Sequence, residues 1–201
     1  MEKVKCIEYR GIRDLIAAEV IEDSADNFET GTPFHVAWTS ELSRETEASS
    51  ENHYYDNVAA ITINGSGADT VTIATAAIPL DIIAKLTGQF YEEETGMFIE
   101  GEREEKQFAI GYVTEDTSGE EVFVWRLKGT FNVPGETHGT KNDGTDANGQ
   151  ELTYTGMQTI HKFKKRGKGE RAVNCYKSKC PLSESEFFAT VQTPDTVKAS
   201  A

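Results

Sequence analysis

The sequence has few cysteines and no long apolar run, and each shortage excludes a class of protein. Three cysteines in 201 residues do not suggest a disulfide framework, and Cys175 and Cys180 alone do not make a zinc site. No apolar run reaches the roughly 18 residues that a membrane span needs. The N-terminal stretch MEKVKCIEY lacks the apolar segment of a signal peptide, so we expect synthesis in the cytoplasm and reduced thiols.

Basic residues are also scarce, and they are unevenly distributed. The chain holds 20 Lys and Arg against 34 Asp and Glu, a net charge of −14. Residues 1–150 carry −18, whereas residues 151–201 carry +4 and include the basic run HKFKKRGKGER at 161–171. Three interpretations of this run remain open: a solvated strand end and turn, contact with an acidic part of another copy, or nucleic-acid binding. The acidic body disfavours the last because it repels phosphate.

Most of the remaining pattern predicts β-strands. Strands at 14–23 and 34–38 are expected to pair as one hairpin. A second hairpin is predicted from 58–63 and 69–75, joined at Asn64-Gly65, a pair of residues that adopts positive φ at low cost.

A third hairpin is predicted from 107–116 and 122–134, and a further strand at 150–163. Along 122–134 the side chains alternate between a dry face and a polar face, as in a half-buried strand. The dry face consists of Phe123, Trp125, Leu127, Phe131 and Val133, and the polar face of Arg126, Lys128, Thr130 and Asn132.

One short helix is predicted at about 79–87. Its apolar residues recur at helical spacing and form a single stripe, which consists of Pro79, Ile82, Ile83 and Leu86. Asp81 lies in the first turn, where the helix dipole favours a negative charge, and Gly88 is placed to end the helix in the left-handed conformation. A helix this short is not stable alone in water, so we expect it to pack on a sheet.

Two polar stretches, 39–57 and 135–149, lack an apolar period and are predicted to be extended loops. We expect residues 1–193 to form a single domain and residues 194–201 a flexible C-terminal tail. Strand patterns separated by turns, without a βαβ rhythm, predict a mainly β protein. The expected architecture is an antiparallel β-sandwich or partly open barrel of about eight strands, with one short helix and long polar loops.

Motifs for catalysis or ligand binding are incomplete in this chain. The glycine-rich stretch NGSGADT lacks the Lys-Ser/Thr ending of a phosphate loop and opens no helix. The stretch DGTDANGQEL lacks acidic residues at the first and last positions of a calcium loop, which leaves at most a loosely held surface cation. The four histidines stand apart and outside any ligand motif. We therefore expect no catalytic residue, no cofactor and no metal site.

Several stretches of the chain follow, in order, the pattern of one protein family. They are YRGIRDLIAAEVIEDSADNFETGTPFHVAW at 9–38, HYYDN at 53–57, IPLDIIAKLTGQFYEEETG at 78–96, FAIGYVT at 108–114, VFVWRLKGTFNVPGE at 122–136 and LTYTGMQTIHKF at 152–163. Trp125, Lys128 and Gly129 are among the matching positions. In these stretches the chain resembles the major tail protein, or tail tube protein, of phages with long non-contractile tails.

The resemblance implies a sandwich-like β fold with a helix beside it, in which six copies close into a ring. Rings would stack around a tape-measure protein, and DNA would later pass through the tube without specific binding. Other implied partners are the tail terminator and the baseplate or initiator proteins, with no membrane partner. The protein would be made in the host cytoplasm and reside in the tail of the virion. A contractile tail tube, a prophage and a phage-derived particle remain open.

Contacts between copies are expected where an open sheet has edges to cover, because a cyclic assembly pairs those edges. The two long polar stretches could bridge copies, and the basic run could meet an acidic surface. The candidate contact residues are Tyr54, Tyr55, Asp56, His138, Lys164, Lys165 and Arg166. An acidic channel wall would repel the closely spaced phosphates of DNA.

Two other classes of function remain open. One is a monomeric β-sandwich module that binds a carbohydrate or a host surface through Tyr54, Tyr55 and Tyr91. The other is an enzyme that uses a pair of carboxylates. Carboxylates such as Glu92, Glu93 and Glu94 are abundant in this chain, but such clusters in an acidic protein are usually solvated faces. Rings or hollow fibres in electron micrographs would favour the tube, whereas a monodisperse monomer would favour the binding module.

Overall fold

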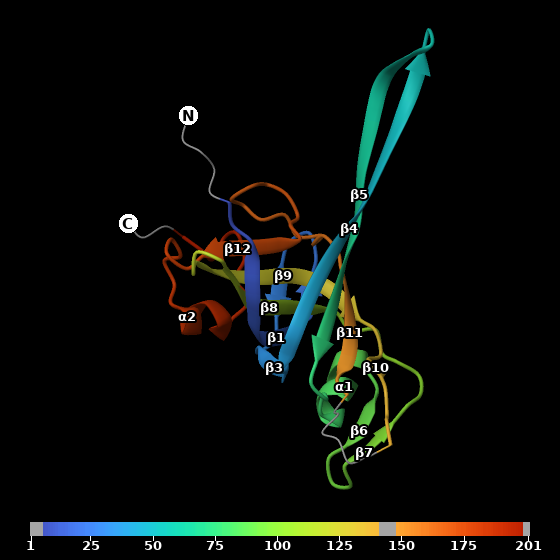
Figure 1. Ribbon diagram of the computed structural model, residues 1–201, viewed down its shortest axis with the longest axis vertical. Helices are drawn as coiled ribbons and strands as arrows, with labels where there is room; N and C mark the ends of the chain where they lie inside the picture. The colour runs from blue at the N-terminus through green and yellow to red at the C-terminus, as the bar shows by residue number, and fades with distance from the viewer. Residues whose placement is uncertain (1–5, 141–147, 199–201) are drawn as a thin grey trace.

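The computed structural model describes residues 6–140 and 148–198 (Figure 1). Residues 141–147 and 199–201, which belong to the predicted loop at 135–149 and to the predicted tail, lie outside the described residues. The strands are β1 (Tyr9–Asp23), β2 (Phe28–Thr30), β3 (Phe34–Ala37), β4 (Thr39–Tyr55), β5 (Val58–Thr75), β6 (Phe90–Glu92), β7 (Met97–Ile99), β8 (Phe108–Asp116), β9 (Glu121–Phe131), β10 (Gly135–Glu136), β11 (Gln150–Gly156) and β12 (Ala172–Tyr176). The helices are α1 (Leu80–Thr87) and α2 (Glu184–Ala189).

Ten strands form one antiparallel sheet with the order β2-β1-β8-β9-β11-β5-β4. The strands β3, β10 and β12 pair with β1, β11 and β9 respectively, and β6 and β7 form a separate hairpin. The sheet is not closed into a barrel, so β4 lies at an edge. The predicted mainly β, antiparallel fold is confirmed, but the described residues contain twelve strands instead of about eight and two helices instead of one.

The central strands are buried on both faces. On β1, Leu15 and Ala17 belong to one apolar cluster, whereas Ile16 and Ala18 belong to another. Successive side chains of a strand point to opposite faces, so the two clusters lie on opposite sides of this part of the sheet. Burial on both faces explains why β8 begins with the nearly continuous apolar run FAIGYV.

Helix α1 covers the first cluster, near β5 and β11 (Figure 1). Its Ile83 and Leu86 are buried against Ile73 of β5, which confirms the predicted helix and most of its stripe. Burying one such side chain stabilises the fold by about 1.5–3 kcal/mol. Pro79, predicted to belong to the stripe, is instead the exposed residue that precedes the helix.

Gly88 ends α1 with a φ of 68°, as predicted. A Cβ atom at this position would lie 2.1 Å from the backbone oxygen of Glu104, so only glycine fits. The backbone N–H of Glu104 donates to the carbonyl oxygen of Gly88 at 3.0 Å. The segment that follows β7 is therefore held against the end of the helix.

Helix α2 covers the second cluster and was not predicted from the sequence. Its Phe187 and Phe188 pack against Trp125 and Phe123 of β9. The indole nitrogen of Trp125 donates to the carbonyl oxygen of Phe187 at 3.0 Å. The signal was present in SESE at 183–186, where Ser183 and Glu186 form a capping box.

The polar face of β9 is buried as well as the dry face. Lys128 donates to the carboxylate of Asp23 at 2.6 Å, and Arg126 pairs with Asp69. Burial disfavours the charge on Asp23, but hydrogen bonds from Ile160, Lys128 and His161 outweigh it and hold the pKa of Asp23 below its ordinary value.

Val133, predicted to lie on the dry face, is 42% exposed because β9 already ends at Phe131. The first hairpin is confirmed, since β3 pairs with β1, and so is the hairpin of β8 and β9. The strand predicted at 150–163 ends at Gly156, and Phe163 beyond it is buried in the second cluster.

The prediction of a loop at 39–57 was wrong. These residues form β4, which pairs along its length with β5, and the hairpin predicted at Asn64-Gly65 does not exist because β5 runs through it. The true turn is Asp56-Asn57, where both residues have positive φ, 51° and 63°. The sequence was misleading because the outer part of this hairpin is exposed on both faces, so it shows no buried apolar alternation.

The predicted loop at 135–149 begins with two strand residues, since β10 pairs with β11. In the C-terminal segment, the carboxylate of Asp195 accepts hydrogen bonds from the backbone of Lys164 and Lys165, both at 2.9 Å. Flexibility of residues 194–201 stays a prediction, as does the single domain of residues 1–193.

Candidate functional site

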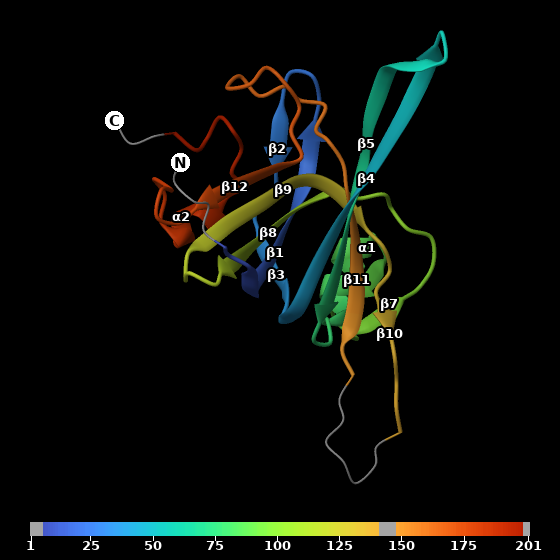
Figure 2. The ribbon, with the colours of Figure 1, turned by 45° about the horizontal axis from the view of Figure 1, so that its top comes forward.

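A long two-stranded arm projects from the body of the molecule (Figures 1 and 2). It is the outer part of the hairpin of β4 and β5, beyond the pair Thr46–Asp69, and its tip is the turn Asp56-Asn57. The strand register shifts between Thr46 and Ala48, which marks a bulge where the arm leaves the body. We call residues 47–67 the arm.

One face of the arm is apolar. Residues that lie directly opposite each other in an antiparallel pair share a face, and the register pairs Tyr55 with Val58, His53 with Ile61, and Glu51 with Ile63. These pairs come from every second residue of β4, and the register shift between His53 and Tyr54 adds one residue to β5 there, so all three pairs lie on one face. The apolar face of the arm consists of Tyr55, Val58, Ile61 and Ile63, whose exposed fractions are 61%, 64%, 50% and 54%.

The opposite face of the arm is more polar. It contains Asn52 and Thr62, whose side chains are joined by a hydrogen bond of 2.8 Å, and Tyr54, which is paired with Ala59. A two-stranded ribbon that buries neither face is at best marginally stable in water. The arm is therefore amphipathic, and no other part of the described residues covers its apolar face.

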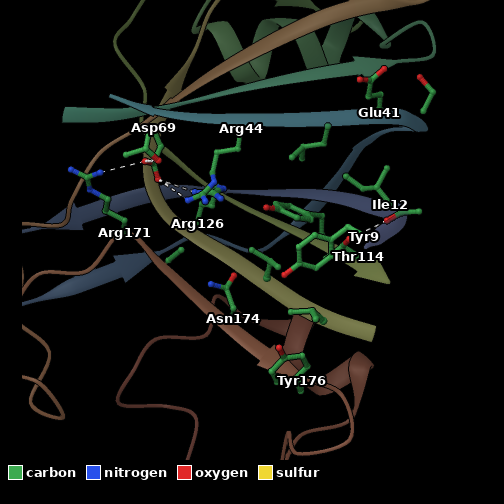
Figure 3. A pocket seen from close by; sticks show the side chains of 18 residues that line it. Tyr9, Ile12, Glu41, Arg44, Asp69, Thr114, Arg126, Arg171, Asn174 and Tyr176 are labelled. Carbon is green, nitrogen blue, oxygen red and sulfur yellow. Dashed lines mark hydrogen bonds and ion pairs between the residues drawn. The ribbon is translucent and has the colours of Figure 1, made fainter. Parts of the chain in front are cut away.

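The root of the arm, in contrast, is fixed by a cluster of charged groups (Figure 3). The carboxylate of Asp69 on β5 lies 3.0 Å from Arg126 of β9, 3.3 Å from Arg171 and 4.0 Å from Arg44 of β4. Thr46 donates to the same carboxylate at 2.8 Å. Asp69 and Arg126 are almost completely buried, so this contact ties the base of the arm to the centre of the sheet.

The cluster lies at one end of an open pocket of about 820 Å³ (Figure 3). Residues from β1, β4, β8, β9 and β12 line it, and Tyr9, Tyr112 and Tyr176 supply aromatic rings. The lining contains no histidine or cysteine, so the pocket offers no nucleophile paired with an imidazole base. The ion pairs at this end of the pocket therefore anchor the root of the arm to the body.

The candidate contact residues fall into three separate places. Tyr54, Tyr55 and Asp56 lie together at the tip of the arm, with the two tyrosines on opposite faces. His138 follows β10 and lies 3.4 Å from the carboxylate of Glu136, with its side chain 83% exposed. The structure does not bring His138 to the arm or to the basic run.

The third place is a basic turn at residues 162–168, which holds Lys164, Lys165 and Arg166. It is closed by a bridge between Phe163 and Lys168, and the buried ring of Phe163 anchors it in the second cluster. All of its charged side chains are exposed.

Contacts with the C-terminal segment fix the shape of this turn. The backbone N–H of Lys165 is the main reason that the pKa of Asp195 lies below its ordinary value, and the N–H of Lys164 adds to it. Arg166 pairs with Glu170 at 3.3 Å. For Lys162, Lys164 and Lys168, no ion pair is found among the described residues.

Three residues of the apolar face were missed by the sequence reasoning. Val58, Ile61 and Ile63 were assigned to a short hairpin in which VAAITI pairs with DTVTIAT, and no contact between copies was expected of them. The distinguishing signal was their position next to a polar stretch of matching length, which becomes β4.

No helix among residues 6–140 and 148–198 is long and apolar enough to cross a membrane. In that same part of the chain, no three His, Cys, Asp or Glu side chains gather in a way that could hold a metal ion.

Comparison with known proteins gives one family. The family model for the phage tail tube protein matches residues 43–187, a range that includes both the arm and the basic turn. No curated protein matches the chain. Because the match covers well over half of the 201 residues, the chain belongs to the phage tail tube protein family, whose members are structural components of the phage tail that assemble into a tube.

Proposed function

We propose that the protein forms hexameric rings that stack around a tape-measure protein, and that another copy buries the apolar face of the arm. Tail terminator and baseplate or initiator proteins would bound the tube, and the virion tail would be its final location after synthesis in the host cytoplasm. The family assigns a structural subunit of a tube, and the arm supports the contact between copies.

The observation that carries this proposal is the apolar face itself. Four large apolar side chains, each at least half exposed, lie on one side of a projecting ribbon. Such a surface is costly in a monomer and marks an interaction site. Tyrosine and β-branched residues also suit a strand that packs against another protein.

The charge of the chain supports a channel through which DNA slides. Residues 1–150 carry −18, and a wall with excess carboxylates offers phosphates no attractive site. In this proposal DNA passes without specific binding, and the few buried cations, such as Arg126 and Lys128, are already paired with carboxylates.

The experiment is electron microscopy and size-exclusion chromatography of purified protein, with initiator proteins added where growth needs them. The double substitution of Val58→Asp and Ile61→Asp should abolish rings and tubes while the monomer keeps its unfolding midpoint. Thr62→Asp, between Ile61 and Ile63 but on the other face, is the matched control and should still assemble. Normal tubes from the double variant would contradict the role of the apolar face, and a wild type that is always a monodisperse monomer would favour a binding module.

A further inference from the structure

Charge is distributed unequally along the long axis of the molecule. Residues 92–105, which run from the tip of the β6–β7 hairpin towards β8, contain seven glutamates and one arginine, a net charge of −6. The basic turn at 162–168 contains five cations and no anion, a net charge of +5. In Figure 1 the β6–β7 hairpin lies at the lower end, whereas the orange turn lies on the upper side of the body, the side from which the arm projects.

The acidic segment is held in place without neutralising its glutamates. The guanidinium of Arg103, its only cation, donates to the carbonyl oxygens of Thr87 and Phe131 at 3.0 and 2.7 Å. The backbone of Glu104 is bonded to Gly88, as described above. The side chains of Glu93, Glu94, Glu100, Glu102, Glu104 and Glu105 are exposed.

The basic turn likewise combines a fixed backbone with exposed charged side chains, which here are positive. Its backbone is fixed by Asp195 and by the buried ring of Phe163, while Lys162, Lys164 and Lys168 extend into solvent. Both surfaces thus carry several charged side chains without an ion pair among the described residues, on a backbone that is held in place. A single exposed ion pair contributes little, so a contact between these surfaces depends on several charges acting as a network.

We propose that the acidic segment of one copy packs against the basic turn of the next copy along the tube. This inference rests on the proposed function, because it needs copies that follow one another along an axis. A contact between two different surfaces of the same chain is heterologous and generates an open filament when repeated. Opposite charges at the two ends of each copy also disfavour head-to-head stacking, since like charges would then meet.

The arm fits the same direction of stacking. It projects beyond the basic turn on the same side of the body (Figures 1 and 2), so it would extend alongside the copy whose acidic segment meets that turn. The apolar face then supplies burial, and the charged pair supplies the polarity of the stack. Double-stranded DNA is the competing partner for the basic turn, but the turn is narrow and the chain as a whole carries −14, which repels phosphate.

The test uses two reversals and their combination. Replacing Lys162, Lys164, Lys165 and Lys168 with glutamate changes the basic turn from +5 to −3, and replacing Glu93, Glu94, Glu100 and Glu102 with lysine changes the acidic segment from −6 to +2. Each fourfold variant should reduce the yield of sedimentable tubes at least tenfold, whereas the eightfold variant, in which the signs of the two surfaces are exchanged, should assemble close to wild-type yield. Arg10→Glu with Lys179→Glu is the control, because it changes two exposed cations outside both surfaces.

The outcomes separate this inference from the proposed function. Wild-type tubes together with unaffected fourfold variants would overturn the charge pairing and leave the tube intact. Loss of tubes in both fourfold variants without rescue in the eightfold variant would also overturn it. A fluorescence anisotropy titration with a 20-base-pair duplex checks the competing partner: binding that disappears in the fourfold variant of the basic turn, combined with normal tubes from that variant, would assign the turn to DNA. Wild-type growth should also slow as salt rises, because exposed charges are screened within about 10 Å at 0.1 M.

Discussion

The two halves of the hairpin of β4 and β5 have the same secondary structure, but one half is buried and the other is exposed. At its root, Val71 and Ile73 of β5 are completely buried under α1 and the neighbouring strands. At its tip, Ile61 and Ile63 of the same strand are 50% and 54% exposed. The difference lies in what surrounds each half, since the root has β11 on its other edge and the tip has only β4.

The polar groups of the two halves differ in the same way. Asp69 at the root is surrounded by guanidinium groups and a hydroxyl, whereas the tip is held by backbone pairing and one exposed hydrogen bond between Thr62 and Asn52. The root is thus tied to the body by buried contacts, whereas the tip has an exposed apolar face that we propose is covered by another copy. In a protein that assembles, one strand can serve both purposes, and the bulge between Thr46 and Ala48 separates them.

Replacing Asp69 with alanine gives the largest expected effect on this comparison. The guanidinium of Arg126, whose side chain is 7% exposed, would lose its buried anion. Leaving one partner of a buried ion pair alone costs about 3–5 kcal/mol. Chemical denaturation of the monomer should show this loss, or the variant should fail to fold. Glu51→Ala on the arm should stay within about 0.5 kcal/mol of wild type; a similar cost at both positions would show that root and tip are equivalent.

The isoleucines of β5 provide a matched pair for the apolar side of the comparison. Ile73→Ala removes a fully buried side chain and should destabilise the monomer by about 2–5 kcal/mol, while Ile61→Ala should change stability by less than about 0.5 kcal/mol. Tube assembly should show the opposite order of effects. Ile61→Ala should lower the tube yield even though its monomer is fully folded. Unfolding curves and sedimentation of the two variants measure both quantities. If Ile61→Ala destabilised the monomer as much as Ile73→Ala, the tip would already be packed within one copy.

The root of the hairpin could be predicted from the sequence, and the tip could not. DTVTIAT at 69–75 alternates as a half-buried strand does, and the helix after it shows a clear stripe and a glycine end signal, all of which the structure confirms. In the arm, Ile61 and Ile63 are half exposed, and the run at 58–63 was assigned to a hairpin with 69–75 that does not exist. In β4, apolar and polar residues do not alternate. Backbone pairing with β5 is enough to hold this strand extended, so its side chains need not alternate.

The same reasoning explains the partial success with the candidate contacts. Tyr54, Tyr55 and Asp56 were noted within a stretch predicted to be a loop, and they lie at the tip of the arm. Arg126 and Lys128 were expected on a solvent-facing polar side, but their carboxylate partners are 57 and 105 residues away in the sequence. No local pattern reports a pairing over such a distance. Contacts made by His138, Lys164, Lys165 and Arg166 with another copy stay a prediction.

The smallest effect is expected at the turn that closes the arm. Asp56 and Asn57 both have positive φ, a conformation that a two-residue hairpin turn requires and that glycine adopts without steric cost. Asn57→Gly should therefore stabilise the closed arm by about 0.4 kcal/mol, which corresponds to about a twofold slower hydrogen exchange of the paired amides. Asn57→Ala should act in the opposite direction, since its Cβ disfavours positive φ.

Hydrogen exchange of the monomer, resolved by residue, measures where this change stops. If the arm opens independently of the body, amides paired beyond the bulge, such as those of Glu51 and Ile63, should respond to both substitutions. The amide of Val71, which lies on the body side of the bulge and pairs with Tyr154 of β11, should not respond. An equal change at Val71 would mean that arm and body unfold as one unit, and the bulge would then not divide the hairpin into two regions. A response confined to the arm would show that its order in the monomer depends on the turn and on its own strand pairing.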